Sequence, residues 1–205
     1  MDWENEQIFQ RNRLPARSYF FPPSTMSLNG DWKFNYAPSP AEAPAPSTKH
    51  ELWSKYQSIP VPSHWQLQGH GRPHYTNVQL PFAADPPYVP SENPTGSYYR
   101  TFTVPAEWED GASLRLRFDG VDSAFHLLVN EQEVGYSQGS RNPAEFDITG
   151  YVRRHEANDL LVRVYQWSDG SYIEDQDQWW LSGKSKIALN HFRALLRSFR
   201  YLQKR

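Results

Sequence analysis

Ser113-Leu-Arg-Leu-Arg-Phe118 alternates polar and apolar side chains without a fault, which is the period of a strand that buries one face. Similar runs lie on both sides of it, at residues 28–36, 98–104, 123–129, 133–136, 146–149 and 160–165. Turn residues separate many of these runs at intervals of about 8–12 residues, a spacing typical of a sandwich or jelly roll. The sequence therefore predicts an all-β fold in one domain without an internal repeat.

The composition agrees with short strands joined by many turns. Aromatic residues make up 15% of the 205 residues, alongside 17 prolines and 11 glycines, a balance that favours strands over a helical bundle. The chain has no cysteine, which excludes disulfides and cysteine-ligated metal sites. No apolar run of 18 residues and no leader-like N-terminus occurs, so we expect no membrane span and a cytoplasmic location.

The charge is unevenly distributed along the chain. The whole sequence has a formal charge of −2, but residues 184–205 hold seven basic residues and no acid, which leaves residues 1–183 at −9. Nucleic-acid binding depends on basic patches that displace phosphate counterions. The acidic body therefore predicts no nucleic-acid partner.

The side chains best suited to binding a ligand are concentrated in residues 165–183, after the apolar run at 160–165. Three carboxylates of this segment, Glu174, Asp175 and Asp177, sit among three tryptophans and a tyrosine: Trp167, Trp179, Trp180 and Tyr172. Aromatic faces stack on the C–H faces of sugar rings, and carboxylates accept hydrogen bonds from hydroxyls. One interpretation is a carbohydrate-facing loop at the end of a sheet. The alternative is a surface loop whose tryptophans turn inward and whose acids are solvated.

Three histidines, His64, His70 and His74, follow one another in a Gly/Pro-rich segment. Their spacing is not that of a helical ligand face, and no nearby pattern supplies a fourth ligand. We expect ordinary hydrogen bonding there and predict no metal at the histidines. Just beyond them, Asn77 offers an amide that can both donate and accept.

Seven motifs in one order resemble a known family. They are Gly30-Asp-Trp-Lys-Phe34, Val61-Pro-Ser-His-Trp-Gln66, Tyr75-Thr-Asn-Val78, Glu92-Asn-Pro-Thr-Gly96, Phe118-Asp-Gly-Val-Asp-Ser-Ala-Phe-His126, Glu145-Phe-Asp147 and Trp167-Ser-Asp-Gly-Ser-Tyr-Ile-Glu-Asp-Gln-Asp177. Together they resemble the N-terminal sugar-binding domain of large β-galactosidases, the lactose-cleaving members of glycoside hydrolase family 2. The resemblance covers residues 2–183.

The resemblance implies a galactose-binding-like jelly roll, residues 29–183, preceded by an irregular N-terminal arm, residues 1–28, that takes part in homo-oligomer assembly. It also implies that this domain is the first of several in a longer chain. The two catalytic glutamates of these retaining enzymes, and a magnesium ion, belong to a later (β/α)8 barrel. We therefore expect no catalytic residue among these 205 residues, and no hydrolysis of β-galactosides by them alone.

The resemblance also marks two site residues. Asn77 matches an asparagine at the substrate site, and Asp177 matches an aspartate that binds galactose hydroxyls and a sodium ion. Asp175 and Asp177 lie close enough in sequence to form a retaining pair, which needs carboxyl groups about 5–5.5 Å apart. The resemblance favours binding instead, with Glu174 and Asp175 shaping the loop. A free-standing galactose-binding module and an interaction fragment without hydrolase activity are the alternative functions.

The resemblance stops after residue 183. Five apolar side chains then fall at helical spacing: Phe192, Leu195, Leu196, Phe199 and Leu202. Basic residues form a second stripe in the same segment. This pattern predicts either a basic amphipathic helix for a membrane surface or partner groove, or a spurious extension of a truncated gene model. We expect the truncation to remove a closing strand from the sandwich and to leave a sheet edge unpaired.

Overall fold

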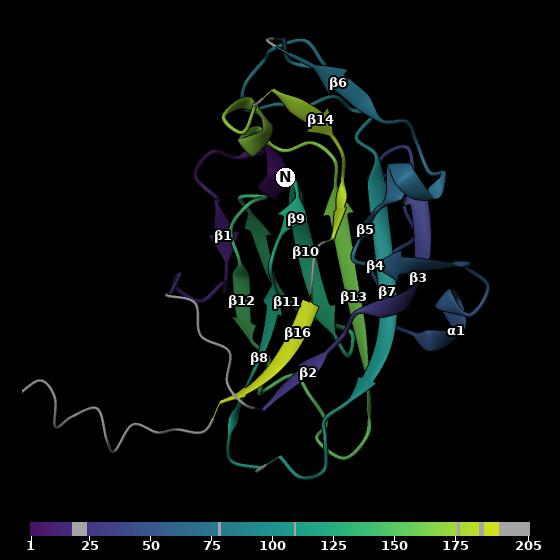
Figure 1. The fold of residues 1–205 in the computed structure, drawn as a ribbon, viewed down its shortest axis with the longest axis vertical. Helices are drawn as coiled ribbons and strands as arrows, with labels where there is room; N and C mark the ends of the chain where they lie inside the picture. The colour runs from purple at the N-terminus through teal and green to yellow at the C-terminus, as the bar shows by residue number, and fades with distance from the viewer. Residues whose placement is uncertain (18–23, 78, 109, 176, 185–186, 193–205) are drawn as a thin grey trace, which may run out of the picture.

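The computed structural model describes residues 1–17, 24–77, 79–108, 110–175, 177–184 and 187–192 (Figure 1). Helical elements are short: η1 (Asp2–Glu4), α1 (His50–Trp53), η2 (Trp65–Gln68) and η3 (Asp169–Tyr172). The strands are β1 (Gln10–Arg11), β2 (Thr25–Ser27), β3 (Gly30–Ala37), β4 (Ser58–Val61), β5 (Ser63–His64), β6 (His74–Thr76), β7 (Thr95–Thr103), β8 (Ser113–Phe118), β9 (Val121–Asp122), β10 (Ala124–Val129), β11 (Gln132–Gln138), β12 (Ala144–Asp147), β13 (Ala157–Tyr165), β14 (Gln178–Trp180), β15 (Gly183–Lys184) and β16 (Ile187–Phe192). The predicted all-β fold is confirmed. No helix in the described part of the chain is long and apolar enough to cross a membrane.

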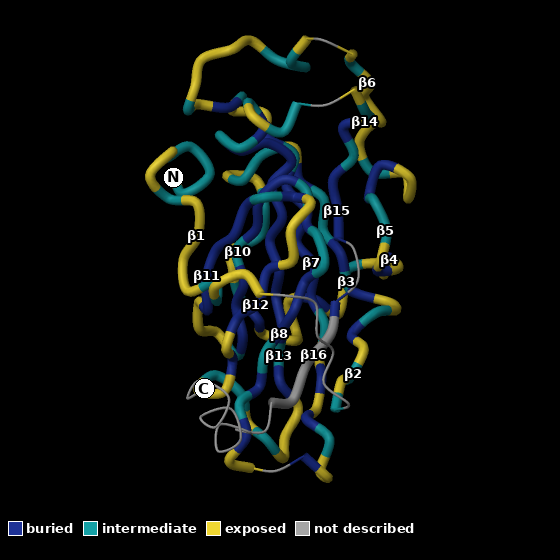
Figure 2. The backbone as a smooth tube through the Cα atoms, turned by 60° about the vertical axis from the view of Figure 1, so that its left-hand side comes forward, coloured by how far each residue is buried: buried dark blue, intermediate teal, exposed yellow. Residues whose placement is uncertain are grey.

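Two antiparallel sheets form the sandwich. The larger has the order β1-β11-β10-β13-β7-β3-β4, and the smaller has the order β12-β8-β16-β2. Apolar side chains from both sheets meet in one core, in which Phe118, Phe125 and Phe146 pack with ring centroids 4.8–6.2 Å apart. The backbone is accordingly buried along the middle strands and exposed at the turns (Figure 2).

The outer face of the larger sheet is also covered, which explains why β7 and β13 are buried almost continuously. Trp53 of α1 stacks on Tyr99 with ring centroids 5.5 Å apart. Trp3 of the N-terminal arm stacks on Tyr165 at 4.0 Å. The larger sheet is therefore covered by the core on one face and by the stacked side chains of Trp53 and Trp3 on the other.

The described part of the N-terminal arm packs on this chain's own sandwich. It adds β1 to the edge strand β11, pairing Gln10 with Ser137 and Arg11 with Tyr136. Asp2 accepts hydrogen bonds from Arg11 Nε at 2.6 Å and Nη2 at 3.0 Å. The sequence predicted only an irregular arm here, because no local period marks residues that pair with a distant strand edge.

The expectation of a missing closing strand is wrong. β16 lies in the middle of the smaller sheet, pairing with β8 on one side and β2 on the other. Its first side chain, Ile187, is fully buried in the core. The described start of the basic segment is therefore a strand. Its backbone pairing with β8 and β2 outweighs the helical spacing of the apolar side chains in the sequence. The remainder of the predicted helix, residues 193–205, lies outside the described residues.

The two ends of the sandwich carry different structures. β10 and β13 run antiparallel, with Ala124 opposite Tyr165 at one end and Val129 opposite Leu160 at the other. The chain leaves the first end into η3 and the two-stranded ribbon of β6 and β14, at the top of Figure 1. The ribbon thus projects beyond the sheets, where it is accessible.

Candidate functional site

The two residues predicted to meet a sugar lie at the same end of the β6–β14 ribbon. The antiparallel register places Thr76 opposite Gln178 and Tyr75 opposite Trp179. Asn77 directly follows Thr76, and Asp177 directly precedes Gln178. The pairing of β6 with β14 therefore brings to one end of the ribbon two residues that are 100 positions apart in the sequence.

A hydrogen bond fixes the position of the Asp177 carboxylate. Tyr75 Oη donates to Asp177 Oδ1 at 2.6 Å, and both residues are exposed. This hydrogen bond raises the pKa of the Tyr75 phenol above its usual value, because the phenol proton is held by the carboxylate. Asn77 is exposed as well. The arrangement presents an oriented acceptor and an amide on one accessible edge.

Only one of the three tryptophans of this region faces solvent. Trp179 is 56% exposed and packs against Tyr75 with ring centroids 5.5 Å apart. Trp167 and Trp180 are buried and pack on each other at 5.3 Å. Trp180 Nε1 also donates to Thr76 Oγ1 at 2.7 Å, which ties β14 to β6. The inward interpretation is thus correct for Trp167 and Trp180 and wrong for Trp179.

The loop between η3 and β14 is anchored to the sandwich by Glu174. Its carboxylate accepts hydrogen bonds from Ser140 N at 2.9 Å and Ser140 Oγ at 2.5 Å. Ser168, at the start of η3, bonds to the buried Ser123 at 3.0 Å. Glu174 therefore shapes the loop, and its oxygens are occupied within the protein. Asp177 is the acid of the three that lies exposed, while Asp175 is partly buried.

The histidines and acids form no metal centre in the described part of the chain. His70 packs edge-on against Phe34 at 4.9 Å, while His74 is exposed at the start of β6. No group of three histidine or acidic side chains gathers there in an arrangement that could hold a metal ion. Asp177 can supply one hard oxygen ligand of the kind that sodium accepts. Any further ligands would have to be carbonyls, waters or groups from outside this chain.

Tyr75 is a site residue that sequence reasoning missed. It stands two positions before Asn77 in the Tyr-Thr-Asn motif, so alternation places both side chains on one face of β6. That spacing was a usable signal. The hydrogen bond between Tyr75 and Asp177 could not be predicted from sequence, because it spans 102 positions.

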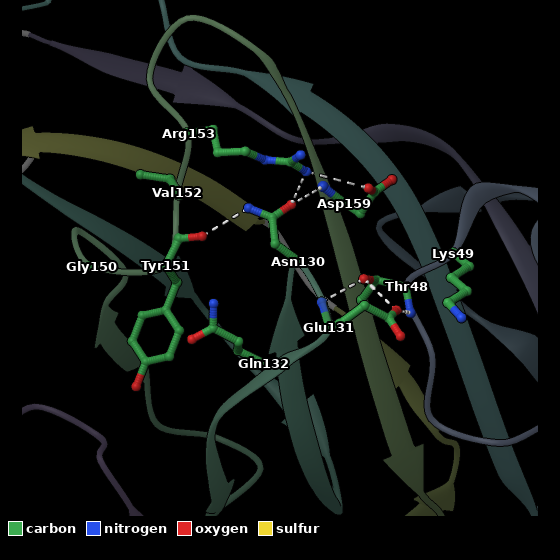
Figure 3. A pocket seen from close by; sticks show the side chains of 10 residues that line it. All are labelled: Thr48, Lys49, Asn130, Glu131, Gln132, Gly150, Tyr151, Val152, Arg153 and Asp159. Carbon is green, nitrogen blue, oxygen red and sulfur yellow. Dashed lines mark hydrogen bonds and ion pairs between the residues drawn. The ribbon is translucent and has the colours of Figure 1, made fainter.

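A pocket of about 450 Å3 lies at the opposite end of the sandwich, beyond the β10–β11 turn (Figure 3). Asn130 donates to Tyr151 O at 2.8 Å and accepts from Asp159 N at 2.9 Å and Arg153 Nη2 at 2.9 Å. Glu131 accepts from the Thr48 hydroxyl at 2.8 Å and so holds the end of residues 37–48, a loop rich in proline and alanine. These polar groups bind one another, so their role is to hold that loop against the sandwich.

The family model described as "Glycosyl hydrolases family 2, sugar binding domain" matches residues 25–191. Similar sequences include a beta-galactosidase of Yersinia enterocolitica, 47% identical over 195 residues, and one of Kluyveromyces lactis, 48% identical over 184 residues. The alignments cover 89% and 87% of this chain but only 18% of each relative. The chain thus spans about a fifth of the length of the relatives it matches.

Solved structures show the same fold at lower identity. A beta-glucuronidase of Bacteroides uniformis superposes with a TM-score of 0.61 at 22% identity, over 82% of this chain and 18% of that one. A beta-glucuronidase of Ruminococcus gnavus gives a TM-score of 0.58 at 18% identity, over 83% and 28% of the two chains. At these identities the likeness concerns the fold alone.

Proposed function

The chain belongs to glycosyl hydrolase family 2 as the sugar binding domain of beta-galactosidases, and from that membership we propose that its β6–β14 ribbon contacts a terminal β-D-galactoside such as lactose. The observation that carries the proposal is that Asn77 and Asp177 flank the last pair of the ribbon, Thr76 and Gln178, and are both exposed. Both lie in motifs of the family, and neither is used to stabilise the sandwich.

The chemistry of the ribbon suits a sugar. The Asp177 carboxylate, held by Tyr75, can accept from two neighbouring hydroxyls, and Asn77 can donate to one hydroxyl oxygen while accepting from another. The exposed indole of Trp179 offers an apolar face of the kind that packs on sugar C–H groups. These contacts fix the orientation of a galactoside, and the chemistry of bond cleavage needs other groups.

We propose that those groups lie outside this chain, as two glutamates of a barrel domain acting by the retaining mechanism, with magnesium at that barrel. Asp177 would give one oxygen to a sodium ion, a hard cation whose charge the carboxylate offsets. The 205 residues by themselves would then be inactive in hydrolysis. The whole protein would act in lactose metabolism, as a cytoplasmic homo-oligomer.

Galactose titration of the 205-residue chain, followed by Trp179 fluorescence and NMR shifts, tests the proposal. A ribbon open to water on an exposed end should bind with a millimolar dissociation constant or weaker, about −4 kcal/mol. Asp177→Ala should abolish the shifts, whereas Asp31→Ala, which removes an exposed carboxylate of β3, should leave them unchanged. Shifts that survive Asp177→Ala contradict the site.

The same titration separates the alternatives. Micromolar binding that Asp177→Ala abolishes would favour a free-standing galactose-binding module. In a full-length enzyme, Asp177→Asn should weaken turnover and the response to sodium together, since one substitution removes both a hydroxyl acceptor and an anionic ligand. Unchanged kinetics and unchanged sodium dependence would show that the role assigned to Asp177 is wrong.

A further inference from the structure

A pocket of about 390 Å3 lies where the N-terminal arm crosses the edge of the smaller sheet, away from the β6–β14 ribbon. Its lining includes Arg13 and Arg17 from the arm, Arg117 from β8, Asn142 and a single carboxylate, Glu145 of β12. Residues 1–183 carry a formal charge of −9. The three guanidinium groups around this pocket are therefore opposite in sign to the net charge of the rest of the domain.

Main-chain pairing places the arm over this pocket. Arg13 forms an isolated β-bridge with Phe146, and Leu14 N donates to Glu145 O at 2.8 Å. The arm is therefore extended along β12 at this point, and the side chains of Arg13 and Arg17 enter a space whose other wall belongs to the sandwich. The pocket exists only while the arm is docked.

The positive charges in the pocket exceed the negative ones. Glu145 is shared by Arg17, at 2.7 and 2.8 Å, and Arg117, at 3.3 Å. Asp119 pairs with the other side of Arg117 at 2.6 Å. Two carboxylates thus face three guanidinium groups, which leaves one positive charge in excess.

That excess belongs to Arg13. Its guanidinium donates to the neutral acceptors Gln10 Oε1 at 2.6 Å, Ser137 Oγ at 2.9 Å and Gln138 O at 3.0 Å, and lies 4.7 Å from the Phe9 ring centroid. Among the described residues, no carboxylate forms an ion pair with it. Burial lowers the pKa of Arg13, as expected for a cation taken from water without an anion beside it.

We propose that this pocket binds the phosphate group of a small phosphorylated molecule. Guanidinium N–H groups donate charge-assisted hydrogen bonds to phosphate oxygens, and the Asn142 amide adds a further donor. The rest of the lining includes apolar surface that suits the body of such a ligand, from Phe9, Leu14, Pro15, Ala16 and Pro143. The volume lies in the range of small-molecule sites. The excess charge selects an anion over a neutral sugar.

Phosphate binding would also lock the arm. Arg13 and Arg17 come from the arm, whereas Arg117 and Asn142 come from the sandwich, so one ligand bridges the two. A ligand that binds only the docked state stabilises that state by mass action. The pocket thereby couples a dissolved phosphate compound to the docking of residues 1–17.

Thermal unfolding of the 205-residue chain tests the proposal. Sodium phosphate at 20 mM is compared with sodium chloride of equal ionic strength, which removes general screening effects. For a millimolar site, Tm should rise by about 3–6 °C. A sugar phosphate, glucose 6-phosphate, with unphosphorylated glucose as its control, distinguishes a bare phosphate site from one that also accepts the organic body.

Arg13→Gln should abolish the shift, whereas Arg72→Gln, which removes an exposed arginine elsewhere, should preserve it. Glutamine can still donate to the neutral acceptors of Arg13, and an unchanged Tm in chloride would verify that the variant folds. NMR titration of the folded chain at 25 °C gives a second readout, with shifts expected at residues 13–17, 117 and 142. No phosphate-specific shift, or an equal shift in Arg13→Gln, overturns the proposal.

Discussion

The N-terminal arm and the strands β15 and β16 both join the sandwich by backbone pairing, yet their side chains fit it very differently. Asp2 meets Arg11 and His126, and Trp3 stacks on Tyr165. Lys184 of β15, in contrast, is fully buried, with its Nζ 4.0 Å from the Trp32 ring centroid and 3.9 Å from that of Tyr98. Within the described residues, Lys184 Nζ has no hydrogen-bond partner.

The comparison shows that strand pairing and side-chain fit are separate conditions. The backbone of β15 pairs with β5 and β9 whatever side chain it carries. Two aromatic faces stabilise an ammonium by about 2 kcal/mol or more when desolvated, but burying a charge without hydrogen bonds costs several kcal/mol. Burial therefore outweighs the ring contacts and lowers the pKa of Lys184 well below its usual value. Asp2 of the arm, in contrast, has its charge compensated by hydrogen bonds with Arg11 and His126.

Replacing Lys184 should have the largest effect on this comparison. Lys184→Met keeps the length of the side chain and removes the buried amine, so we expect the free energy of unfolding to rise by about 2–4 kcal/mol. Urea denaturation measures it. Lys49→Met, at an exposed lysine, serves as the control and should change stability by less than about 0.5 kcal/mol. A loss of stability in Lys184→Met would mean that the amine is favourably accommodated.

The pH dependence of stability should carry the signature of the same residue. Because the folded-state pKa of Lys184 lies below the unfolded value of 10.5, the unfolded chain binds a proton that the folded chain lacks between those two values. Stability contributed by this group therefore rises with pH in that window, by up to about 1.4 kcal/mol per pH unit. The free energies of unfolding of the parent chain and of Lys184→Met, measured from pH 7 to 9.5, should differ most at pH 7. Parallel curves would contradict the assignment.

Trp3→Ala should loosen the arm. It removes the stack on Tyr165 and the edge contact with His126, whose ring centroid is 6.2 Å from that of Trp3. We expect a loss of about 2 kcal/mol and faster amide exchange at Gln10 and Arg11. Trp179→Ala, at the exposed tryptophan of the ribbon, is the matched control and should cost less than about 1 kcal/mol. Equal losses would show that the arm contributes little to the fold.

Asp2→Asn should have the smallest effect. The hydrogen bond with Arg11 is the main cause that lowers the pKa of Asp2, followed by the contact with His126 at 3.3 Å. The stabilisation is present above the unfolded pKa of about 3.8 and is lost as pH falls through the lowered folded value. We expect a cost of about 0.5–1 kcal/mol at pH 7. Acid unfolding that is identical in parent and variant would exclude a role for Asp2 in docking the arm.

Local patterns were sufficient for most of the fold. The alternation at residues 113–118 predicted β8, and the neighbouring apolar runs predicted β10 and β13 close to their observed bounds, since both signals are carried by adjacent residues. Ordered motifs were sufficient to recognise the family and to select Asn77 and Asp177 as candidates.

Long-range pairing decided the rest. Only the pairing of β6 with β14 brings Asn77 and Asp177 to the same end of the ribbon, and only packing turns Trp167 and Trp180 inward while Trp179 stays exposed. β16 is a strand because β8 and β2 leave a place for it, despite a helical spacing that begins in its last residue. These features depend on which distant segment lies alongside. A sequence determines its own periodicity directly, whereas the partners of each strand follow from the free energy of the whole chain.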